Sequence, residues 1–254
     1  MKIISYNVNG LRSAMSKGLL DWVQQVQPDV LCLQEIKAGR EALDVAGFEA
    51  LGYHCYLYPA QKPGYSGVAV FSKRAPNKVA PGCGHEAYDF EGRVLRLDFD
   101  DVSVLNVYMP SGTSGDERQA FKLEWLKWFS AYVQQLRATV PPLVICGDFN
   151  CCPTAIDLHN PKANQNSPGY TPAERAWFAD FLATGFTDSF RHHHGEAPHH
   201  YSWWSYRAGS RKRNVGWRLD YLLADNALQP RLAAAGLLPD AVHSDHCPAF
   251  VELA

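Results

Sequence analysis

The sequence of 254 residues lacks any long apolar run, since no stretch reaches the roughly 18 consecutive apolar residues that span a bilayer. It also lacks a C-x-x-C pair and a low-complexity segment, and its seven cysteines are an odd number. The first ten residues, MKIISYNVNG, carry one charge and then alternate as a strand does, unlike a signal peptide. These absences predict a protein without a membrane segment, with reduced thiols and a cytoplasmic location.

A strong charge of either sign is missing too. The formal net charge is −2 and the sequence pI is about 6.5. This argues against coating a polyanion, because non-specific binding of nucleic acid needs clustered lysine and arginine. A local basic face remains open, because five cationic residues fall close together: Arg207, Arg211, Lys212, Arg213 and Arg218. The alternative interpretation of this cluster is a solvated loop.

What the sequence does contain is typical of one globular domain with a large core. Hydrophobic residues make up 46% and charged residues 20%, and no composition break divides residues 1–254. The expected strands are Lys2–Tyr6, Asp29–Leu33, Gly67–Phe71, Val94–Phe99, Val102–Val107, Leu143–Cys146, Trp217–Leu223 and Ala249–Leu253. The expected helices are an apolar stripe from Leu19 to Val26, a long one from about Asp116 to Arg137, and one that a capping box opens at Thr171. Because strands outnumber helices, we predict α/β layers with sheet packed on sheet.

Polar side chains lie near one end of six of the expected strands. They are Asn7 and Asn9, Gln34 and Glu35, Tyr108, Asp148 and Asn150, Asp220, and Asp245 and His246. Any one of them is ordinary, since chains leave sheets through polar residues. Six together, with four carboxylates and almost no lysine, predict that one rim of the sandwich assembles a site. Gly147, directly before Asp148, would let the backbone approach a substrate closely.

The four carboxylates, which are Glu35, Asp148, Asp220 and Asp245, would repel one another in a shared concave site. A divalent cation resolves this, and carboxylate with amide oxygens suits Mg²⁺ or Mn²⁺. His246 adds a titratable imidazole that a carboxylate can orient. We interpret the set as a site for metal-assisted hydrolysis of a phosphodiester.

Plainer interpretations exist for parts of this set. The segment from Asp148 to Asn150 could be a turn, and Asp220 an edge-strand acid paired with Arg218. A zinc-hydrolase motif is half present in His243–His246, but position 241 is alanine, so its first ligand is missing. The histidines at 192–194 and 199–200 are interpreted as decoration of a polar loop. Trp203, Trp204 and Trp217 flank the basic cluster, where aromatic rings either stack on bases and sugars or simply pack in the core.

Eight motifs in order resemble the exonuclease III family of apurinic/apyrimidinic endonucleases, within the endonuclease/exonuclease/phosphatase superfamily. The motifs are NVNGLR (7–12), LQEIK (33–37), GYSGVAVFSK (64–73), EGR (91–93), GDFN (147–150), IDLHNPK (156–162), NVGWRLDY (214–221) and SDHCP (244–248). Single motifs are weakly specific, whereas the ordered set covers nearly the full chain. The stretch NVGWRLDY favours the abasic-site branch over the lipid phosphatases of the superfamily.

This resemblance implies a four-layer α/β sandwich, with two mixed β-sheets face to face between helices. It implies Mg²⁺-dependent cleavage of duplex DNA 5′ to an abasic site, leaving a 3′-hydroxyl and a 5′-deoxyribose phosphate. Removal of 3′-blocking groups and some 3′→5′ exonuclease activity would accompany it. Separately, we expect no membrane association and no obligate protein partner, with a monomer as the default.

Residue roles are implied by the same resemblance. The metal would be held by Asn7, Glu35, Asp148, Asn150, Asp245 and His246, with Glu35 as principal ligand and Asn9 in the outer shell. Asp148 would orient or deprotonate the attacking water, and Asn150 would stabilise the transition state. His246, oriented by Asp220, and Tyr108 would contact the phosphate. The DNA and the pocket for a flipped-out abasic sugar would involve Trp203, Trp217, Leu219, Ser111, Asn164, Arg207, Arg211, Lys212 and Arg213.

Some positions depart from the family pattern, and two rival functions remain. Ser111 stands where many relatives have asparagine, Ser167 where an amide is frequent, and Asn9 where some relatives have aspartate. One rival is a non-catalytic nucleic-acid-associated protein on the same scaffold, which should have lost the acids. The other is a phosphatase for a small phosphorylated molecule, which would not need Trp203, Trp217 and their basic neighbours.

Overall fold

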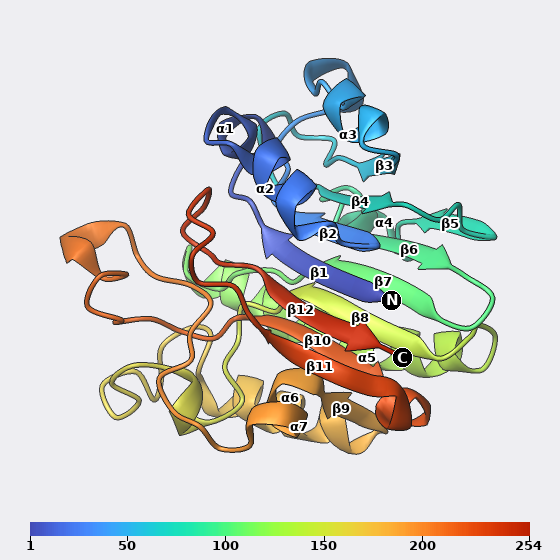
Figure 1. Ribbon diagram of the computed structural model, residues 1–254. Coiled ribbons are helices and arrows are strands. Elements are labelled where there is room, and N and C mark those ends of the chain that lie inside the picture. The colour runs from blue at the N-terminus through green and yellow to red at the C-terminus, as the bar shows by residue number, and fades with distance from the viewer.

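The protein forms two six-stranded sheets that lie face to face, with helices on both outer faces (Figure 1). This architecture comes from a computed structural model that describes residues 1–254, except for the side chain of Arg40. It is the four-layer α/β sandwich that the sequence predicted. Within the described part of the chain, every helix is too short or too polar to span a bilayer.

The first sheet contains both ends of the chain. Its strand order is β11-β12-β1-β2-β4-β3. The strands are β1 Lys2–Asn7, β2 Val30–Gln34, β3 His54–Tyr58, β4 Val68–Ser72, β11 Leu232–Leu237 and β12 Ala249–Leu253. Strands β1 and β2 run parallel, so the residues that follow them, including Glu35, leave the sheet at the same end.

The second sheet has the order β5-β6-β7-β8-β10-β9. Its strands are β5 Lys78–Pro81, β6 Val94–Asp98, β7 Ser103–Tyr108, β8 Leu143–Asp148, β9 Phe186–Asp188 and β10 Asp220–Asp225. Strands β7 and β8 are parallel, with Tyr108 opposite Asp148, and β10 runs antiparallel to β8 with Asp220 opposite Asp148. Three polar residues are therefore neighbours at one end of this sheet.

Helices form the two outer layers. They are α1 Leu11–Ser16, α2 Leu19–Val26, α3 Ala46–Ala50, α4 Glu86–Asp89, α5 Asp116–Arg137, α6 Pro172–Ala183 and α7 Ser189–His194, with short 3₁₀ turns at Arg40–Ala42, Ala155–Asp157, Arg207–Gly209 and Asn226–Arg231. Helices α1–α3 pack on the first sheet and α5 and α6 on the second. The predictions for α2, α5 and the capping box at Thr171 are confirmed.

The prediction of a strand beginning at Trp217 is wrong, because the strand begins at Asp220. Arg218 turns inward instead, and its guanidinium binds the buried carboxylates of Asp157 (2.7 Å) and Asp188 (2.8 Å). Trp217 makes isolated bridges with Trp203 and Leu158. Arg218 is therefore part of an internal ion network and not of a basic surface.

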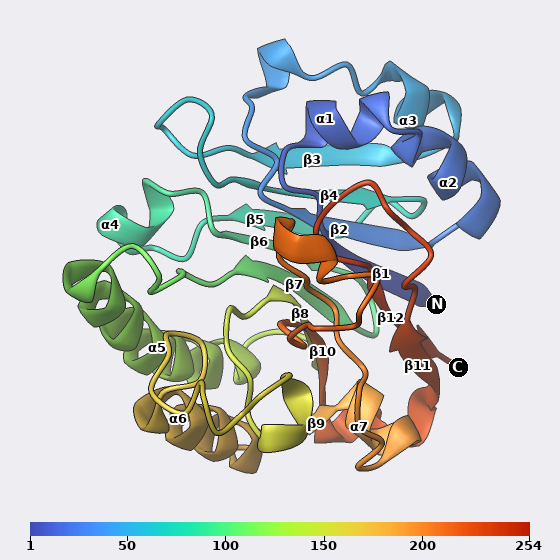
Figure 2. The ribbon, with the colours of Figure 1, turned by 90° about the vertical axis from the view of Figure 1, so that its left-hand side faces the viewer.

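A directional link crosses the apolar layer between the sheets. Asn106 of β7 donates to the carbonyls of Leu33 (3.0 Å) and Ala69 (2.8 Å) and accepts from Gln34 (2.7 Å). These bonds lie just below Glu35 and Tyr108, so they hold the two sheets in register near one rim. Figure 2 looks onto this end of the sandwich, with the loops of both sheets turned toward the viewer.

Gly147 is explained by the packing of strands rather than by access of substrate. A Cβ atom at this position would lie 1.7 Å from the carbonyl oxygen of Val107 on the neighbouring β7. Only glycine therefore allows β8 to run beside β7 up to Asp148.

Candidate active site

The rim seen in Figure 2 carries all six polar strand ends that the sequence singled out, and it contains a cavity of about 410 Å³. The residues lining the cavity are Glu35, Tyr108, Ser111, Thr113, Asp148, Asn150, Ser167, Pro168, Gly169, Trp203, Trp217, Leu219, Asp245 and His246. Asn7 and Asp220 lie buried behind the lining, where they contact its carboxylates and imidazole. Residues from both sheets thus meet in one place.

Three groups at this cavity are spaced to share a cation. Ligand atoms of Glu35, Asp148 and His246 lie within 4.8 Å of one another. Two of them are carboxylates, whose oxygens are the ligands that hard divalent cations prefer, and the third is an imidazole beside them. Asn7 bridges the two acids by donating to Glu35 Oε1 (2.9 Å) and Asp148 Oδ2 (2.8 Å). The residues present therefore fit a divalent metal.

Glu35 stays ionised because it has a cationic neighbour. Burial raises its pKa, but the ammonium of Lys37 and hydrogen bonds from Lys37 and Asn7 more than offset this, so the pKa lies below its ordinary value. Lys37 Nζ lies 2.8 Å from Glu35 Oε2 and also donates to Asn9 Oδ1. A carboxylate held in this form is ready to ligate a cation.

Asp148 has the opposite electrostatic balance. Burial raises its pKa to about 7, with the charges of Asp220 and Glu35 adding to the rise and His246 opposing it. Its Oδ1 accepts the backbone N–H of Asn150 (2.8 Å) and its Oδ2 lies 3.9 Å from His246 Nε2. A carboxylate with a pKa near neutrality is suited to accept a proton from water.

His246 lies between two aspartates. Its Nδ1 is 2.8 Å from Asp220 Oδ2, and Asp220 also accepts the hydroxyl of Ser202 (2.6 Å). Burial lowers the pKa of His246, but the charge of Asp220, with Asp148 and Asp245, raises it to about 10. The imidazolium therefore points Nε2 toward Asp148 as a fixed positive charge.

Asp245 is held by three donors. Asn9 Nδ2 donates to Oδ1 at 2.9 Å, Ser244 Oγ to Oδ1 at 3.2 Å, and Trp203 Nε1 to Oδ2 at 3.1 Å. Burial raises its pKa, but the charge of His246 and the hydrogen bonds from Asn9 and Trp203 lower it below the ordinary value. Asp245 thus stays anionic and joins the acidic rim to one wall of the cavity.

Tyr108 is fixed by the buried Arg93 of the EGR motif. The guanidinium donates to the Tyr108 carbonyl (2.8 Å) and lies 4.6 Å from its ring centroid. Burial, followed by the charge of Glu35, raises the pKa of Tyr108 well above its ordinary value. The phenol therefore keeps its proton and can donate a hydrogen bond.

Another part of the cavity lining is apolar. Trp203, Trp217 and Leu219 cluster with Cys152, Leu158 and Tyr170. Trp203 and Trp217 exchange backbone hydrogen bonds of 2.9 Å in both directions, which holds their two backbone segments side by side. Gly169 packs against Trp217, since a Cβ there would lie 3.3 Å from the indole ring. The result is a slot with one charged and one apolar wall.

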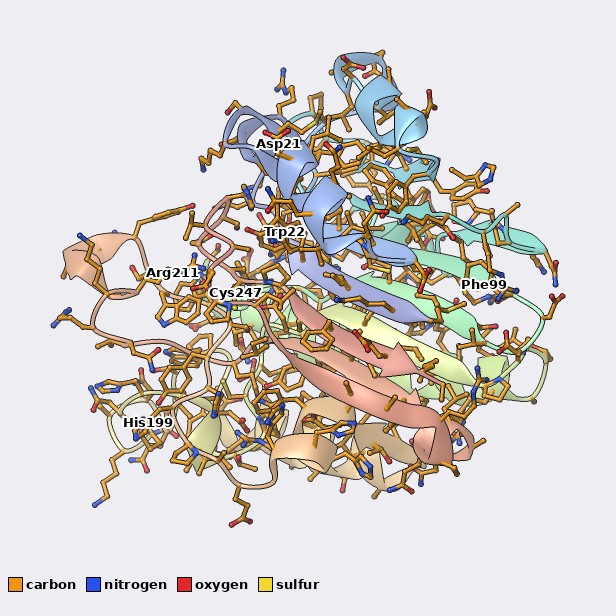
Figure 3. The ribbon with its side chains drawn as sticks, viewed as in Figure 1. Asp21, Trp22, Phe99, His199, Arg211 and Cys247 are labelled. Atoms are coloured by element: carbon orange, nitrogen blue, oxygen red, sulfur yellow. The ribbon has the colours of Figure 1, made fainter. Side chains whose placement is uncertain are left out.

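Several predicted DNA-contact residues lie outside this cavity. Asn164 bonds within its own loop, to the carbonyl of Asn160 (3.0 Å). Arg211 donates to backbone carbonyls of residues 239–246, among them Ala241 and Ser244 (2.9 Å). Figure 3 labels Arg211 beside Cys247 at the site end, with Phe99 at the opposite end. The structure thus gives Arg211 partners inside the protein, and contact with DNA stays a prediction for Arg207, Lys212 and Arg213.

Sequence reasoning did not find two residues that shape the site. Lys37 follows Glu35 in the LQEIK motif, but the predicted set of polar strand ends contains no lysine. Ser202 lies in no strand, yet its hydroxyl accepts the N–H groups of Leu219 (2.9 Å) and Asp220 (3.0 Å). Only Lys37 had a sequence signal, namely its position within a motif.

Comparison with families of known proteins gives one match over most of the chain. A model described as the endonuclease/exonuclease/phosphatase family matches residues 4–246. An exodeoxyribonuclease of Bacillus subtilis is 44% identical over 249 residues, covering 98% of this chain and 97% of that protein. A zebrafish (Danio rerio) protein, DNA repair nuclease APEX1, is 42% identical over 256 residues, covering 100% of this chain and 82% of that protein.

Solved structures give similar results. An AP endonuclease from Archaeoglobus fulgidus has a TM-score of 0.89 at 31% identity, covering 100% of this chain and 99% of that chain. A 3′-5′ exonuclease from Neisseria meningitidis has a TM-score of 0.92 at 29% identity, with the same coverage. The fold described above is therefore shared with nucleases.

Proposed function

The chain belongs to the endonuclease/exonuclease/phosphatase family, as an enzyme of the exonuclease III type, and we propose that it cleaves duplex DNA 5′ to abasic sites with Mg²⁺. The products would be a 3′-hydroxyl and a 5′-deoxyribose phosphate. Removal of 3′-phosphate and other 3′-blocking groups, with some 3′→5′ exonuclease activity, would use the same site. We expect it to act on DNA in the cytoplasm, as a monomer without an obligate partner.

One observation supports this proposal most strongly: a charged group of residues and an aromatic group line the same cavity. Glu35, Asp148 and His246 come together there, and Trp203 and Trp217 line the cavity with them. A small phosphorylated substrate would need only the charged wall. A sugar that has lost its base has no stacking to lose, and a tight apolar slot excludes nucleotides that still carry one.

We propose a role in the reaction for each residue of the charged wall. Glu35 and Asp148, with Asp245, Asn7 and Asn150 nearby, would hold the metal, which when bound would screen the phosphate charge and polarise its oxygen. Asp148 accepts a proton from the attacking water, whose oxygen forms a bond to phosphorus while the bond from phosphorus to the 3′-oxygen breaks. The 3′-oxygen leaves with the bonding electron pair and takes a proton from solvent water, which gives the 3′-hydroxyl. His246, Tyr108 and Asn150 donate to the phosphate oxygens as charge develops.

Incision can be tested directly on a labelled duplex that contains one tetrahydrofuran abasic analogue. We expect a nick immediately 5′ to the analogue with Mg²⁺, weaker or similar cutting with Mn²⁺, and none with EDTA. Binding without cutting under all conditions would favour a non-catalytic relative. Hydrolysis of a small phosphate ester with an intact duplex would favour the phosphatase.

The aromatic slot gives a second test. Trp217→Ala removes one wall, so we expect incision at the abasic analogue to fall by about 10-fold or more, from lost packing on the sugar. Removal of a 3′-phosphate should fall less, because a terminal group does not need to be flipped out. Both rates are measured as kcat/KM on matched duplexes, with Trp177→Phe as the control, since Trp177 packs on α5 away from the cavity. Equal losses for both substrates would contradict the assignment of the slot.

A further inference from the structure

A buried ion pair lies behind the cavity, and the proposed chemistry does not use it. Lys122 of α5 and Glu174 of α6 approach to 2.5 Å, and neither side chain has any exposed surface. Taking both charges out of water is costly, and such pairs give little net stability compared with apolar residues of the same size. A contribution to stability alone therefore does not explain this pair.

Lys122 reaches the segment that carries Asp148, the proposed proton acceptor. Its Nζ donates to the carbonyl of Asn150 at 2.7 Å. Asn150 has a left-handed backbone, with φ of 50°, which is strained for a residue with a side chain. The side-chain amide of Asn150 (Nδ2) donates to the carbonyl of Met109 (2.9 Å), the residue after Tyr108. The ammonium thus holds the turn that places Asn150 against Asp148.

Glu174 reaches the other wall of the cavity. Both of its oxygens accept the backbone N–H of Gly169, at 3.0 and 2.8 Å, and one also accepts the N–H of Thr171 (2.9 Å). Gly169 lies between two parts of the site, since a Cβ there would meet the Asn150 carbonyl at 3.1 Å and the Trp217 ring at 3.3 Å. The Glu174 carboxylate thus fixes Gly169, and Gly169 limits the position of the Trp217 ring.

We propose that Lys122 and Glu174 are positioning residues. They fix the turn at residues 148–150 relative to the aromatic slot that contains Trp217. Lys122 binds the carbonyl of Asn150, and Glu174 binds Gly169, which packs on Trp217. A shift of either charged residue would therefore change the distance between Asn150 and Trp217. This inference rests on the proposed function for its substrate. It predicts that the pair matters more for a flipped abasic sugar, which touches both walls, than for a 3′-terminal phosphate.

The test uses the double variant Lys122→Met with Glu174→Gln. Removing one charge alone leaves the other unpaired in a dry interior and should unfold or weaken the protein, whereas removing both avoids that cost. Glutamine keeps an oxygen for Gly169, and methionine keeps the volume of lysine without its bond to Asn150. We expect a melting temperature close to that of the parent. We expect kcat for incision to fall at least about 10-fold, since misplacement by about 1 Å can cost about 10²-fold. Removal of 3′-phosphate should fall less.

A matched control is Arg96→Met with Asp98→Asn, which removes a largely buried ion pair (2.8 Å) on β6 that does not touch the cavity. Its incision rate should stay within about 2-fold of the parent. An incision rate for the first double variant equal to that of the parent, or an equal loss in the control, would overturn the proposal.

Hydrogen exchange provides a readout independent of activity. Amides of residues 148–152 and 167–171 should exchange faster in the first variant only, and unchanged exchange would also overturn it. If the parent itself does not nick abasic DNA, the proposed function falls, while the exchange result still decides the positioning role.

Discussion

Replacing Asp148 with asparagine is expected to lower kcat for incision by about 10³-fold or more, with little change in KM for the duplex. Asparagine keeps the shape and can still accept the N–H of Asn150, but it cannot take a proton from water. The loss should therefore fall on the chemical step. Single-turnover cleavage of the abasic duplex at saturating protein measures that step without product release.

Because Asp148 is buried, the asparagine variant separates a loss of activity from a loss of stability. Burial raises the pKa of Asp148 from 3.8 to about 7, so folding takes up a proton between these two pH values. The resulting stability is fully present below the ordinary pKa of 3.8 and is lost as the pH rises through about 7. Asparagine cannot ionise, so the metal-free variant should be at least as stable as the parent at pH 8. A drop in activity then cannot be attributed to unfolding.

Asp225→Asn is the matched control, since Asp225 is paired with Arg137 at the far end of β10 from Asp220. This variant should cut at the parental rate. Normal cutting by the Asp148 variant would show that another group activates the water and would remove Asp148 from its assigned role.

The sequence predicted much of this rim because apolar runs locate the strands, and polar residues at the ends of those runs locate the rim. A buried run such as Leu143–Cys146 must end where the sheet ends, and the residues beyond its end must be polar. Parallel pairing of β1 with β2 brings Asn7 and Glu35 to one end of the first sheet, and parallel pairing of β7 with β8 brings Tyr108 and Asp148 to one end of the second. Strands β3, β5, β9 and β11 were not predicted. They are the four edge strands of the two sheets; β5 and β9 have only four and three residues, and β3 and β5 are partly exposed.

The parts that sequence could not supply are contacts between distant loops. Trp217 and Arg218 read as strand residues, because their neighbours alternate as a strand does. Only the fold brings Asp157 and Asp188 to Arg218 and so draws that segment out of the sheet. Likewise, Lys122 on the apolar side of a long helix gave no hint that Glu174 would meet it. Such pairs depend on helix packing, which local patterns do not encode.

Replacing Asp220 with asparagine is the second change with a large expected effect, about 10³-fold in kcat for incision. Asp220 holds His246 Nδ1 at 2.8 Å and leaves Nε2 facing Asp148. Asparagine removes the negative charge that keeps His246 protonated and in place, and the corresponding change in serine proteases costs about 10⁴-fold. We expect a smaller loss here, because we assign His246 to stabilising charge and Asp148 to accepting the proton.

This variant should also change how the rate depends on pH. Burial lowers the pKa of His246, but the charge of Asp220, its hydrogen bond and the charges of Asp148 and Asp245 raise it to about 10. Its contribution to stability is therefore fully present below the ordinary value of 6.5 and is lost only as the pH rises through about 10. In the parent, the imidazolium should persist across the neutral and mildly alkaline range, and the rate should fall only near pH 10.

With asparagine at position 220, the imidazolium loses its nearest counter-charge, so the pKa of His246 falls and the alkaline limb should move to lower pH. A pH–rate profile from pH 6 to 10 measures the limb, and nitrogen-15 spectra of the imidazole titrate the group itself. A merely structural role for Asp220 would lower the rate equally at every pH and leave the limb in place. Movement of both the limb and the imidazole titration would instead place the proton of His246 in the reaction, beside the carboxylate that takes the proton from water.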